Sequence, residues 1–248
     1  MPDLPRRRSG TPSWTQSFAS RLTPAIKALL VTNAVVYLVF LLVVEVRAPM
    51  LAYLGVSPDL RHLPWQPLTA MFLHVRTGGQ GLFGLLLDLL CLWSLGTSLE
   101  RKLGTRRFLT LFFVSGVVAN IAVALALSRF AAQDFYVGPS SAILALFVAF
   151  ARIYGPVPTQ ILPNMAVKAT HMALFWVAIS LLIDLGNRDF PGVAGTLVAV
   201  GAGWLLAAPG GFRQVLDGLR SGLRSRRARQ RYKVLDGGAA RRSRKDWN

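Results

Sequence analysis

Long apolar runs alternate with short polar segments through most of the chain. Several runs approach the 20 or so residues that a helix needs to cross about 30 Å of hydrocarbon. Backbone groups in lipid must find their hydrogen-bond partners within each span, so the runs predict helices. Prolines and polar clusters such as ERKLGTRR and GPVPTQILPN mark the breaks. We therefore predict an all-α membrane protein with six spans, at about 24–44, 81–97, 108–128, 137–155, 166–185 and 191–208.

The composition favours the same class. Of 248 residues, 53% are hydrophobic and 16% charged, so a soluble domain would have too little polar surface to cover itself. The one cysteine, Cys91, lies in an apolar run, where we expect a packed thiol. The first apolar run is too long for the core of a cleavable signal peptide and should remain as a span. The Arg- and Ser-rich leader weakly resembles an organelle transit peptide, although we favour a plain cytosolic tail.

Basic residues gather at the two ends and in two internal loops. The leader with Lys27 has five against Asp3, and the segment from residue 209 has twelve against three acids. With six spans, all of these basic segments fall on one side, so the positive-inside rule places both termini in the cytosol. We expect a basic leader over 1–23, a six-span domain over 24–208 and an Arg-rich, disordered tail over 209–248.

The net charge of +17 does not by itself indicate a nucleic-acid partner, because such binders usually spread their cations along one folded face. The tail's arginines are expected to attract anionic lipid. Its R-x-R tripeptides could instead act as an endoplasmic-reticulum retention address. The expected partners are therefore membrane lipids and membrane proteins. No metal or nucleotide motif is present, so no cofactor is expected.

Small residues recur in the last predicted span. Gly195, Ala199 and Gly203 stand four residues apart, and small side chains at this spacing let two helix backbones approach closely. We expect this face of the helix to pack tightly against another span.

The first span reads PAIKALLVTNAVVYLVF, the first loop contains WQPLTAMFLH, GTSLERKLGTRRFL bridges spans two and three, and GPSSA opens span four. This order of motifs resembles the rhomboid superfamily. Gly96, Glu100 and Gly104 fit the family's G-x-x-x-E-x-x-x-G pattern, which is the most specific part of the likeness. The resemblance covers residues 24 to about 206 and implies a six-helix rhomboid-like bundle.

The resemblance also implies where catalytic residues would stand. Gly138 opens a G-x-S-x motif whose serine is the nucleophile of active rhomboids, and Ser140 falls on that position. The histidine base of these enzymes stands in span six, where alignment on Gly203 gives Thr196. A serine needs a base, and threonine cannot accept a proton at neutral pH.

None of the three histidines, His62, His74 and His171, lies in span six. His171 is expected about 15 Å from the depth of Ser140, because span five enters from the opposite side. His74 is on the serine's side, but in active relatives the corresponding histidine holds the first loop in place.

Other family positions are altered too. The span-two histidine and asparagine that bind the oxyanion in relatives correspond to Gly84 and Asp88, and the first-loop Trp-Arg pair is Trp65 and Gln66. Glycine offers no side-chain donor, and an ionised Asp88 would repel an oxyanion. We expect Asp88, the one charge we identify inside the spans, to make a polar contact within the bundle, with a client-facing role as the alternative.

Two interpretations concern local packing. We expect the hydroxyls of Ser140 and Ser141 to cap the start of span four and to pack against span six. The first-loop residues Trp65, Leu68, Met71 and Phe72 are expected to bury in the outer leaflet.

Together these features favour an inactive rhomboid, a pseudoprotease that binds or scaffolds membrane-protein clients or partners. ALFVAFARIYGPVPTQIL is similar to inactive rhomboids that carry a ubiquitin-associated domain and act in endoplasmic-reticulum protein degradation, although the polar tail could not form such a domain. The expected location is the endoplasmic reticulum or another internal membrane, with the mitochondrion as an alternative. The alternative functions are an active intramembrane serine protease using Ser140 and an unrelated channel or transporter.

Overall fold

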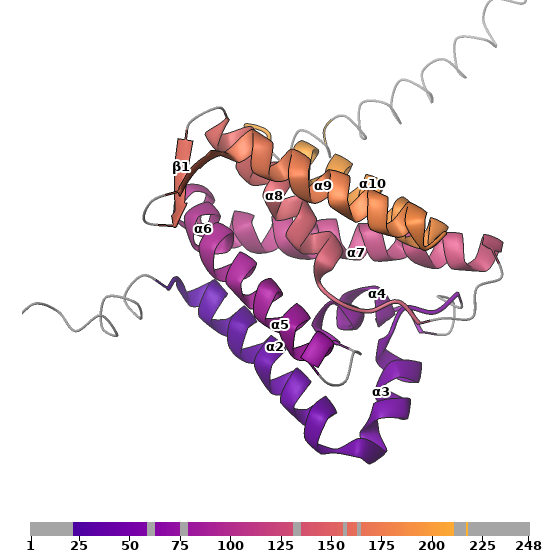
Figure 1. Ribbon diagram of the computed structural model, residues 1–248. Helices are drawn as coiled ribbons and strands as arrows, with labels where there is room; N and C mark the ends of the chain where they lie inside the picture. The colour runs from indigo at the N-terminus through magenta and orange to yellow at the C-terminus, as the bar shows by residue number, and fades with distance from the viewer. Residues whose placement is uncertain are drawn as a thin grey trace, which may run out of the picture. The chain divides into compact units, whose positions relative to one another are not determined.

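The computed structural model describes residues 22–58, 63–74, 79–130, 135–155, 158–162, 165–210 and 217 (Figure 1). The long helices are α2 (Pro24–Leu42), α5 (Gly79–Cys91), α7 (Thr105–Phe130), α8 (Ser140–Tyr154), α9 (Ala169–Gly186) and α10 (Phe190–Leu206). The shorter elements are η1 (Val44–Val46), α3 (Arg47–Leu54), α4 (Gln66–Thr69), η2 (Ala70–Phe72), the π-helical η3 (Leu92–Gly96), α6 (Thr97–Leu103), β1 (Pro158–Leu162) and β2 (Met165–Lys168).

The chain divides into two compact units, residues 1–204 and 205–248. Only residues 205–210 and 217 of the second unit are described. Most of the predicted leader and tail therefore lies outside the described residues, and the three-part organisation stays a prediction.

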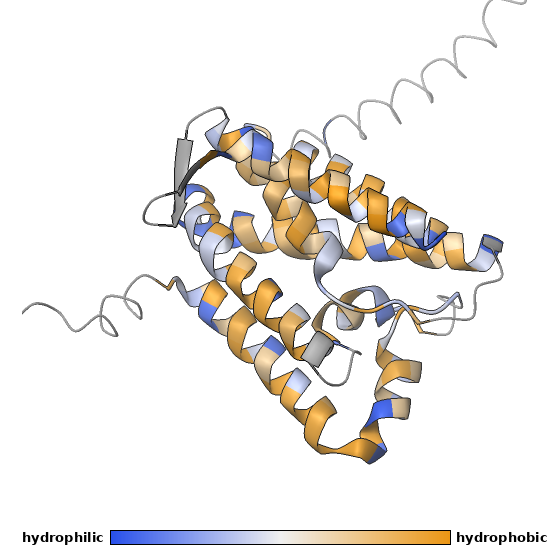
Figure 2. Cartoon of the chain, viewed as in Figure 1, coloured by the Kyte–Doolittle hydropathy of each residue, from blue (hydrophilic) through white to orange (hydrophobic). Residues whose placement is uncertain are grey.

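Among the described residues, four helices are long and apolar enough to cross a membrane. Two further apolar helices, Ser140–Tyr154 and Phe190–Leu206, are shorter. Each predicted apolar window coincides with one of these helices, which confirms the all-α membrane class, while the count of six spans stays a prediction. Most residues along the long helices are hydrophobic (Figure 2). Many apolar side chains are exposed, and those more than half exposed include Val31, Leu42, Leu174, Leu182 and Leu197.

The second predicted span continues further than its apolar window. Through η3 and α6 the helical segment extends to Leu103, past the predicted end at residue 97. The charges of ERK suggested a loop, but Leu99 is fully buried and Glu100 is 3% exposed. The predicted boundary is wrong because Glu100 has partners inside the fold.

The segment between α8 and α9 forms an antiparallel hairpin where a loop was predicted. β1 pairs with β2, with Pro158 opposite Lys168 and Thr159 opposite Val167. The backbone groups of residues 165–168 therefore bond across the hairpin, and α9 begins at Ala169, three residues later than the window suggested.

Helix α8 is enclosed by its neighbours. Every side chain from Ser141 to Phe150 is buried, and α7 and α9 pack along it. A helix in this position meets protein on all faces, so its 15 residues need not match the thickness of the lipid.

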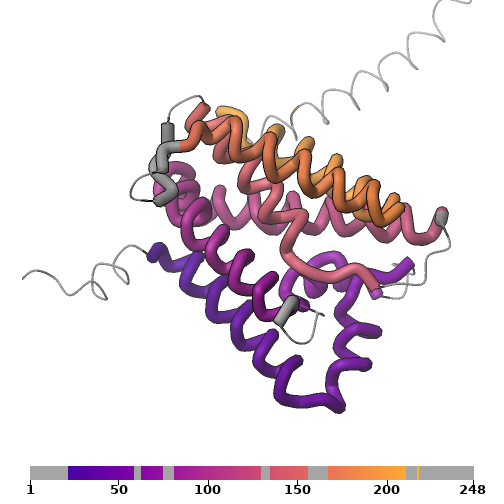
Figure 3. Tube along the Cα trace, viewed as in Figure 1, coloured from indigo at the N-terminus to yellow at the C-terminus, as the bar shows by residue number. Residues whose placement is uncertain are grey.

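The loop before α8 is fixed by backbone hydrogen bonds to the segment after α3 and to η2. Val56 and Tyr136 exchange both N–H···O bonds, at 2.9 and 3.0 Å, and the Gly138 N–H donates to the Ala70 carbonyl at 2.9 Å. The Cα trace shows this loop running past the segment that contains α4 (Figure 3). Gly138 has a φ of 111°, which a side chain would strain. These bonds position the two serines that follow.

Small residues bring α10 against α7 and α8. A Cβ at Gly203 would lie 2.5 Å from the Ala145 carbonyl oxygen, and one at Gly195 would lie 2.7 Å from Val123. Ala199 is fully buried in a cluster with Ala119 and Ala145. The predicted tight packing of this helix face is confirmed.

The first-loop residues do not all face outward. Trp65 and Leu68 are 47% and 43% exposed, but Met71 is 1% exposed and fills the space beside Gly116. The prediction that these side chains share one lipid-facing surface is therefore wrong for Met71. Its side chain enters the bundle because Gly116 leaves room for it.

Glu100 connects three helices. Its carboxylate accepts hydrogen bonds from the Ile26 N–H at 3.3 Å, from the Thr105 hydroxyl at 2.7 Å and from the Thr23 hydroxyl. It thereby satisfies donors at the start of α2, where a negative charge is favoured. Gly96 lets Ile26 approach, since a Cβ there would be 2.4 Å from Ile26 Cδ1.

Gly203→Ala should destabilise the protein by about 1–3 kcal/mol, because the added methyl group meets backbone of α8 that cannot move aside. Gly201→Ala on the same helix is the matched control, since nothing lies within 4 Å of its Cβ position. Unfolding in mixed micelles measures both free energies. Equal effects of the two substitutions would contradict the packing described.

Glu100→Gln should lower the free energy of unfolding by about 2–3 kcal/mol, because the amide replaces one acceptor oxygen with a donor that faces other donors. Glu45→Gln, at an exposed carboxylate in η1, should change the free energy of unfolding by less than about 0.5 kcal/mol. The same unfolding measurement compares them, and an unchanged Glu100→Gln protein would show that this carboxylate does not join the helices.

Candidate functional site

Two serines begin α8 and face different surroundings. Ser140 is exposed, whereas Ser141 is 6% exposed with its Oγ 3.6 Å from the Cβ position of Gly195 on α10. Neither hydroxyl caps the helix, because Pro139 is the N-cap residue and no side-chain cap bond is present. The predicted capping is wrong, while the predicted packing against α10 holds for Ser141.

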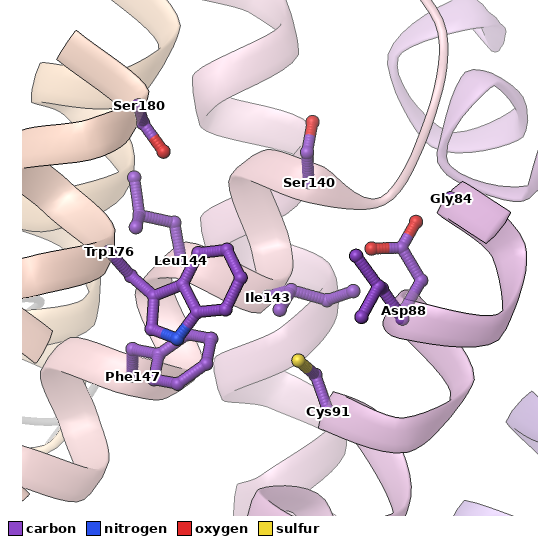
Figure 4. Close-up of a pocket in the computed structure, with 10 residues that line it drawn as sticks. Gly84, Asp88, Cys91, Ser140, Ile143, Leu144, Phe147, Trp176 and Ser180 are labelled. Atoms are coloured by element: carbon purple, nitrogen blue, oxygen red, sulfur yellow. The ribbon is translucent and has the colours of Figure 1, made fainter. Parts of the chain in front are cut away.

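A first cavity, the α5–α9 cavity, lies beside Ser140 and has a volume of about 180 Å³. Its polar lining comes from Asp88 on α5, Ser140 on α8 and Ser180 on α9, and Trp176 and Phe147 form part of its apolar wall (Figure 4). Gly84 also lines it and leaves space there, because a Cβ at that position would meet nothing within 4 Å. The two predicted oxyanion counterparts therefore share a cavity with Ser140.

A second cavity, the α9–α10 cavity, adjoins the first and has a volume of about 140 Å³. It shares Ser140, Leu144 and Ser180 with the α5–α9 cavity. Its lining is more polar, with Tyr136, Ser140, Ser141, Ser180, Asp184 and Thr196. Ser140 thus stands where the two cavities meet.

Thr196 lines the same cavity as Ser140, as the alignment on Gly203 predicts. Its side chain is 7% exposed, and its hydroxyl donates to Asp184 Oδ2 at 3.0 Å. The hydroxyl is therefore engaged with a carboxylate on α9. The role that the family pattern gives to this position stays a prediction.

Asp184 is a site residue that the sequence reasoning missed. It stands two residues before the end of α9 and lines the cavity next to Ser140, so Asp88 is not the only charge within the spans. Asp189 lies close by, since Asp189 Oδ2 and Asp184 Oδ1 are 2.5 and 3.0 Å from the Cβ position of Gly192. The sequence signal was the pair of acids in DLGNRD, five residues apart at the end of the predicted span. We read the whole segment as a polar turn and so did not assign Asp184 to the site.

Tyr136 presents its hydroxyl to the two serines from the loop before α8. Burial, with the carboxylates of Asp184 and Asp189, raises the pKa of Tyr136 to about 12, although hydrogen bonds to Ser140 and Ser141 act in the opposite sense. A phenol with this pKa stays protonated at neutral pH. It can donate a hydrogen bond but cannot remove a serine proton.

Asp88 has the polar contact within the bundle that the sequence analysis predicts. His74 Nε2 lies 3.1 Å from Asp88 Oδ2, and the side chains are 8% and 24% exposed. The rings of His74 and Tyr37 make an edge-to-face contact, with 6.1 Å between their centroids. His74 Nδ1 is buried without a hydrogen-bond partner. The pair joins the first loop to α5.

Gln66, which the resemblance aligns with an arginine of active rhomboids, stabilises the same loop. It is fully buried, accepts from the Ser57 N–H and hydroxyl at 3.0 and 2.7 Å, and donates to the Ala52 carbonyl at 3.0 Å. Trp65 donates from its indole N–H to the Tyr53 carbonyl at 2.9 Å. A neutral amide serves this structural role because its partners are also neutral.

The two described histidines line neither cavity. His74 lies behind Asp88, and His171 is the exposed third residue of α9. His62 lies outside the described residues. Within the part of the chain that is described, no three His, Cys, Asp or Glu side chains are grouped to hold a metal ion.

Comparison with known proteins identifies the class to which this fold and site belong. The Rhomboid domain family matches residues 61–210, which is more than half of the chain, so the protein belongs to the rhomboid family. The chain is also similar to the rhomboid protease GluP of Bacillus subtilis (strain 168), with 38% identity over 58 residues. That segment is 23% of this chain and 10% of GluP, so this chain covers only a small part of its relative.

Asp88→Ala should destabilise the protein by about 1–3 kcal/mol, because it leaves a buried imidazole without its partner. Asp88→Asn retains an oxygen that can accept a hydrogen bond from His74, so its loss of stability should be less than about half of the loss in the alanine variant. Unfolding in mixed micelles separates the two. Equal stability of the alanine variant and the parent protein would contradict the role of the pair.

Proposed function

We propose that this rhomboid is a pseudoprotease, an integral membrane protein that binds or scaffolds membrane-protein clients or partners without cleaving them. The observation that carries the proposal is that Thr196 lines the cavity beside Ser140. The resemblance to active rhomboids assigns their histidine base to this position. The Thr196 hydroxyl is bonded to Asp184 and offers no basic nitrogen.

The other groups around Ser140 do not replace the missing base. Tyr136 remains protonated at neutral pH, because its pKa is raised to about 12. Asp88 and Asp184 line the cavities beside Ser140, but within the described part of the chain neither carboxylate is hydrogen-bonded to its hydroxyl. Each is also bonded through Oδ2 to another side chain.

The oxyanion side is equally unsuited to peptide hydrolysis. Active rhomboids place two donors where this chain has Gly84 and Asp88. Glycine supplies no side-chain donor, and a carboxylate repels the negative charge that develops in the transition state. Loss of one such donor commonly costs about 10²–10³ in rate. The base and oxyanion positions are therefore altered together.

The cavities support a binding role. The α5–α9 cavity has walls from α5, α8 and α9, and it is lined mostly by apolar side chains. The neighbouring α9 presents large exposed side chains such as Leu174, Phe175 and Leu182. An apolar cavity with a few polar groups suits a segment of a transmembrane helix. We take clients of this kind as the ligands.

The cellular setting follows from the likeness to inactive rhomboids. The proposal includes protein quality control in the endoplasmic reticulum or another internal membrane, with both termini in the cytosol. The basic segments of the sequence, which all fall on one side if the chain crosses the membrane six times, support that orientation. Family membership removes the unrelated channel or transporter from consideration.

An active protease is the second candidate, favoured by the exposure of Ser140 within the cavity and by the similarity to GluP. A fluorophosphonate probe separates the two functions, because only an activated serine reacts with it. We expect no labelling of the purified protein at neutral pH, with GluP in the same detergent as the positive control. Labelling that disappears in Ser140→Ala would establish the protease instead.

A further inference from the structure

The two cavities adjoin beside the start of α8, and we call them together the recess. They share Ser140, Leu144 and Ser180, and Asp88 lines the α5–α9 cavity while Asp184 lines the α9–α10 cavity. Each cavity therefore has a carboxylate in its lining. No lysine or arginine is among the described residues that line the recess.

Among the described lining residues, no lysine or arginine pairs with either carboxylate. Asp184 accepts from the uncharged hydroxyl of Thr196, and Asp88 bonds to His74, in each case through Oδ2. A carboxylate has about four lone-pair sites, so each can accept further donors. The recess therefore has the chemistry to receive a positively charged group.

The carboxylates lie at defined depths. We call the side of the membrane at which α8 begins the serine side. Asp184 is two residues from the serine-side end of its span at Gly186, and Asp88 is seven residues from Gly81. At 1.5 Å per residue these depths are about 3 and 10 Å. The recess thus reaches from the interface into the hydrocarbon on this side.

A lysine or arginine in a transmembrane helix is costly in lipid, and so is an aspartate at the same depth. Bringing the two together offsets both costs. The remaining lining, which includes Leu87, Ile143 and Phe147, fits the apolar side chains next to such a residue. We propose that the recess selects clients whose transmembrane helix carries a lysine or arginine within about seven residues of its serine-side end. This inference rests on the proposed client-binding function.

The experiment uses the full chain in phosphatidylcholine nanodiscs, labelled with a donor dye at its N-terminus. The probes are single-span helices of about 25 leucine and alanine residues with an acceptor dye, which differ only at a position about five residues from one end. That position holds lysine, leucine or glutamate. Energy transfer gives the affinity for each helix.

The lysine helix should bind about 10-fold more tightly than the leucine helix, and the glutamate helix more weakly than either. The Asp88→Asn, Asp184→Asn double variant should lose this preference, since asparagine keeps the bonds to His74 and Thr196 without the charge. Glu45→Gln removes a carboxylate outside the recess and should keep the preference.

Several outcomes would overturn the inference. Equal affinity for the lysine and leucine helices would remove charge selection while leaving client binding in place. A lysine preference that persists in the double variant would place the selecting charge elsewhere. Loss of the preference when phosphatidylethanolamine is added would identify a lipid amine as the occupant. Failure to bind any helix would remove the proposed function as well.

Discussion

The close approach of α10 to α8 is the constraint on which the rest of the site depends. Gly203 and Gly195 leave no room for a side chain between the helices, and this fixes both the depth and the rotation of α10. Thr196 follows Gly195 directly and therefore faces the cavity that holds Ser140. A shift of one residue would turn the helix by about 100° and bring a different side chain to that position.

Buried polar groups secure this arrangement in a bundle whose outer surface is apolar. Glu100 satisfies donors at the start of α2, the His74–Asp88 pair joins the first loop to α5, and backbone bonds from Val56 and Ala70 position the segment before α8. These bonds form within the protein because lipid offers no alternative partner. The positions of Ser140 and Thr196 therefore depend on the packing of the bundle.

The helices and the packing face of α10 could be predicted because length, apolar content and small-residue spacing are local properties of the sequence. Three features could not be predicted, because they depend on neighbours distant in the chain. They are the hairpin of β1 and β2, the burial of the Met71 side chain and the burial of Glu100. Within the site, the alignment on Gly203 predicted that Thr196 stands near Ser140. The sequence did not predict that Asp184 lines the recess, because this depends on the contact between α9 and α10.

The central claim is that Ser140 stands in a rhomboid fold without a base to activate it. The most direct measurement is mass spectrometry of a transmembrane substrate incubated with the purified protein in liposomes, beside the Ser140→Ala variant. The account predicts an intact substrate in both samples at neutral pH. Cleavage by the parent protein that is absent from the variant would contradict it.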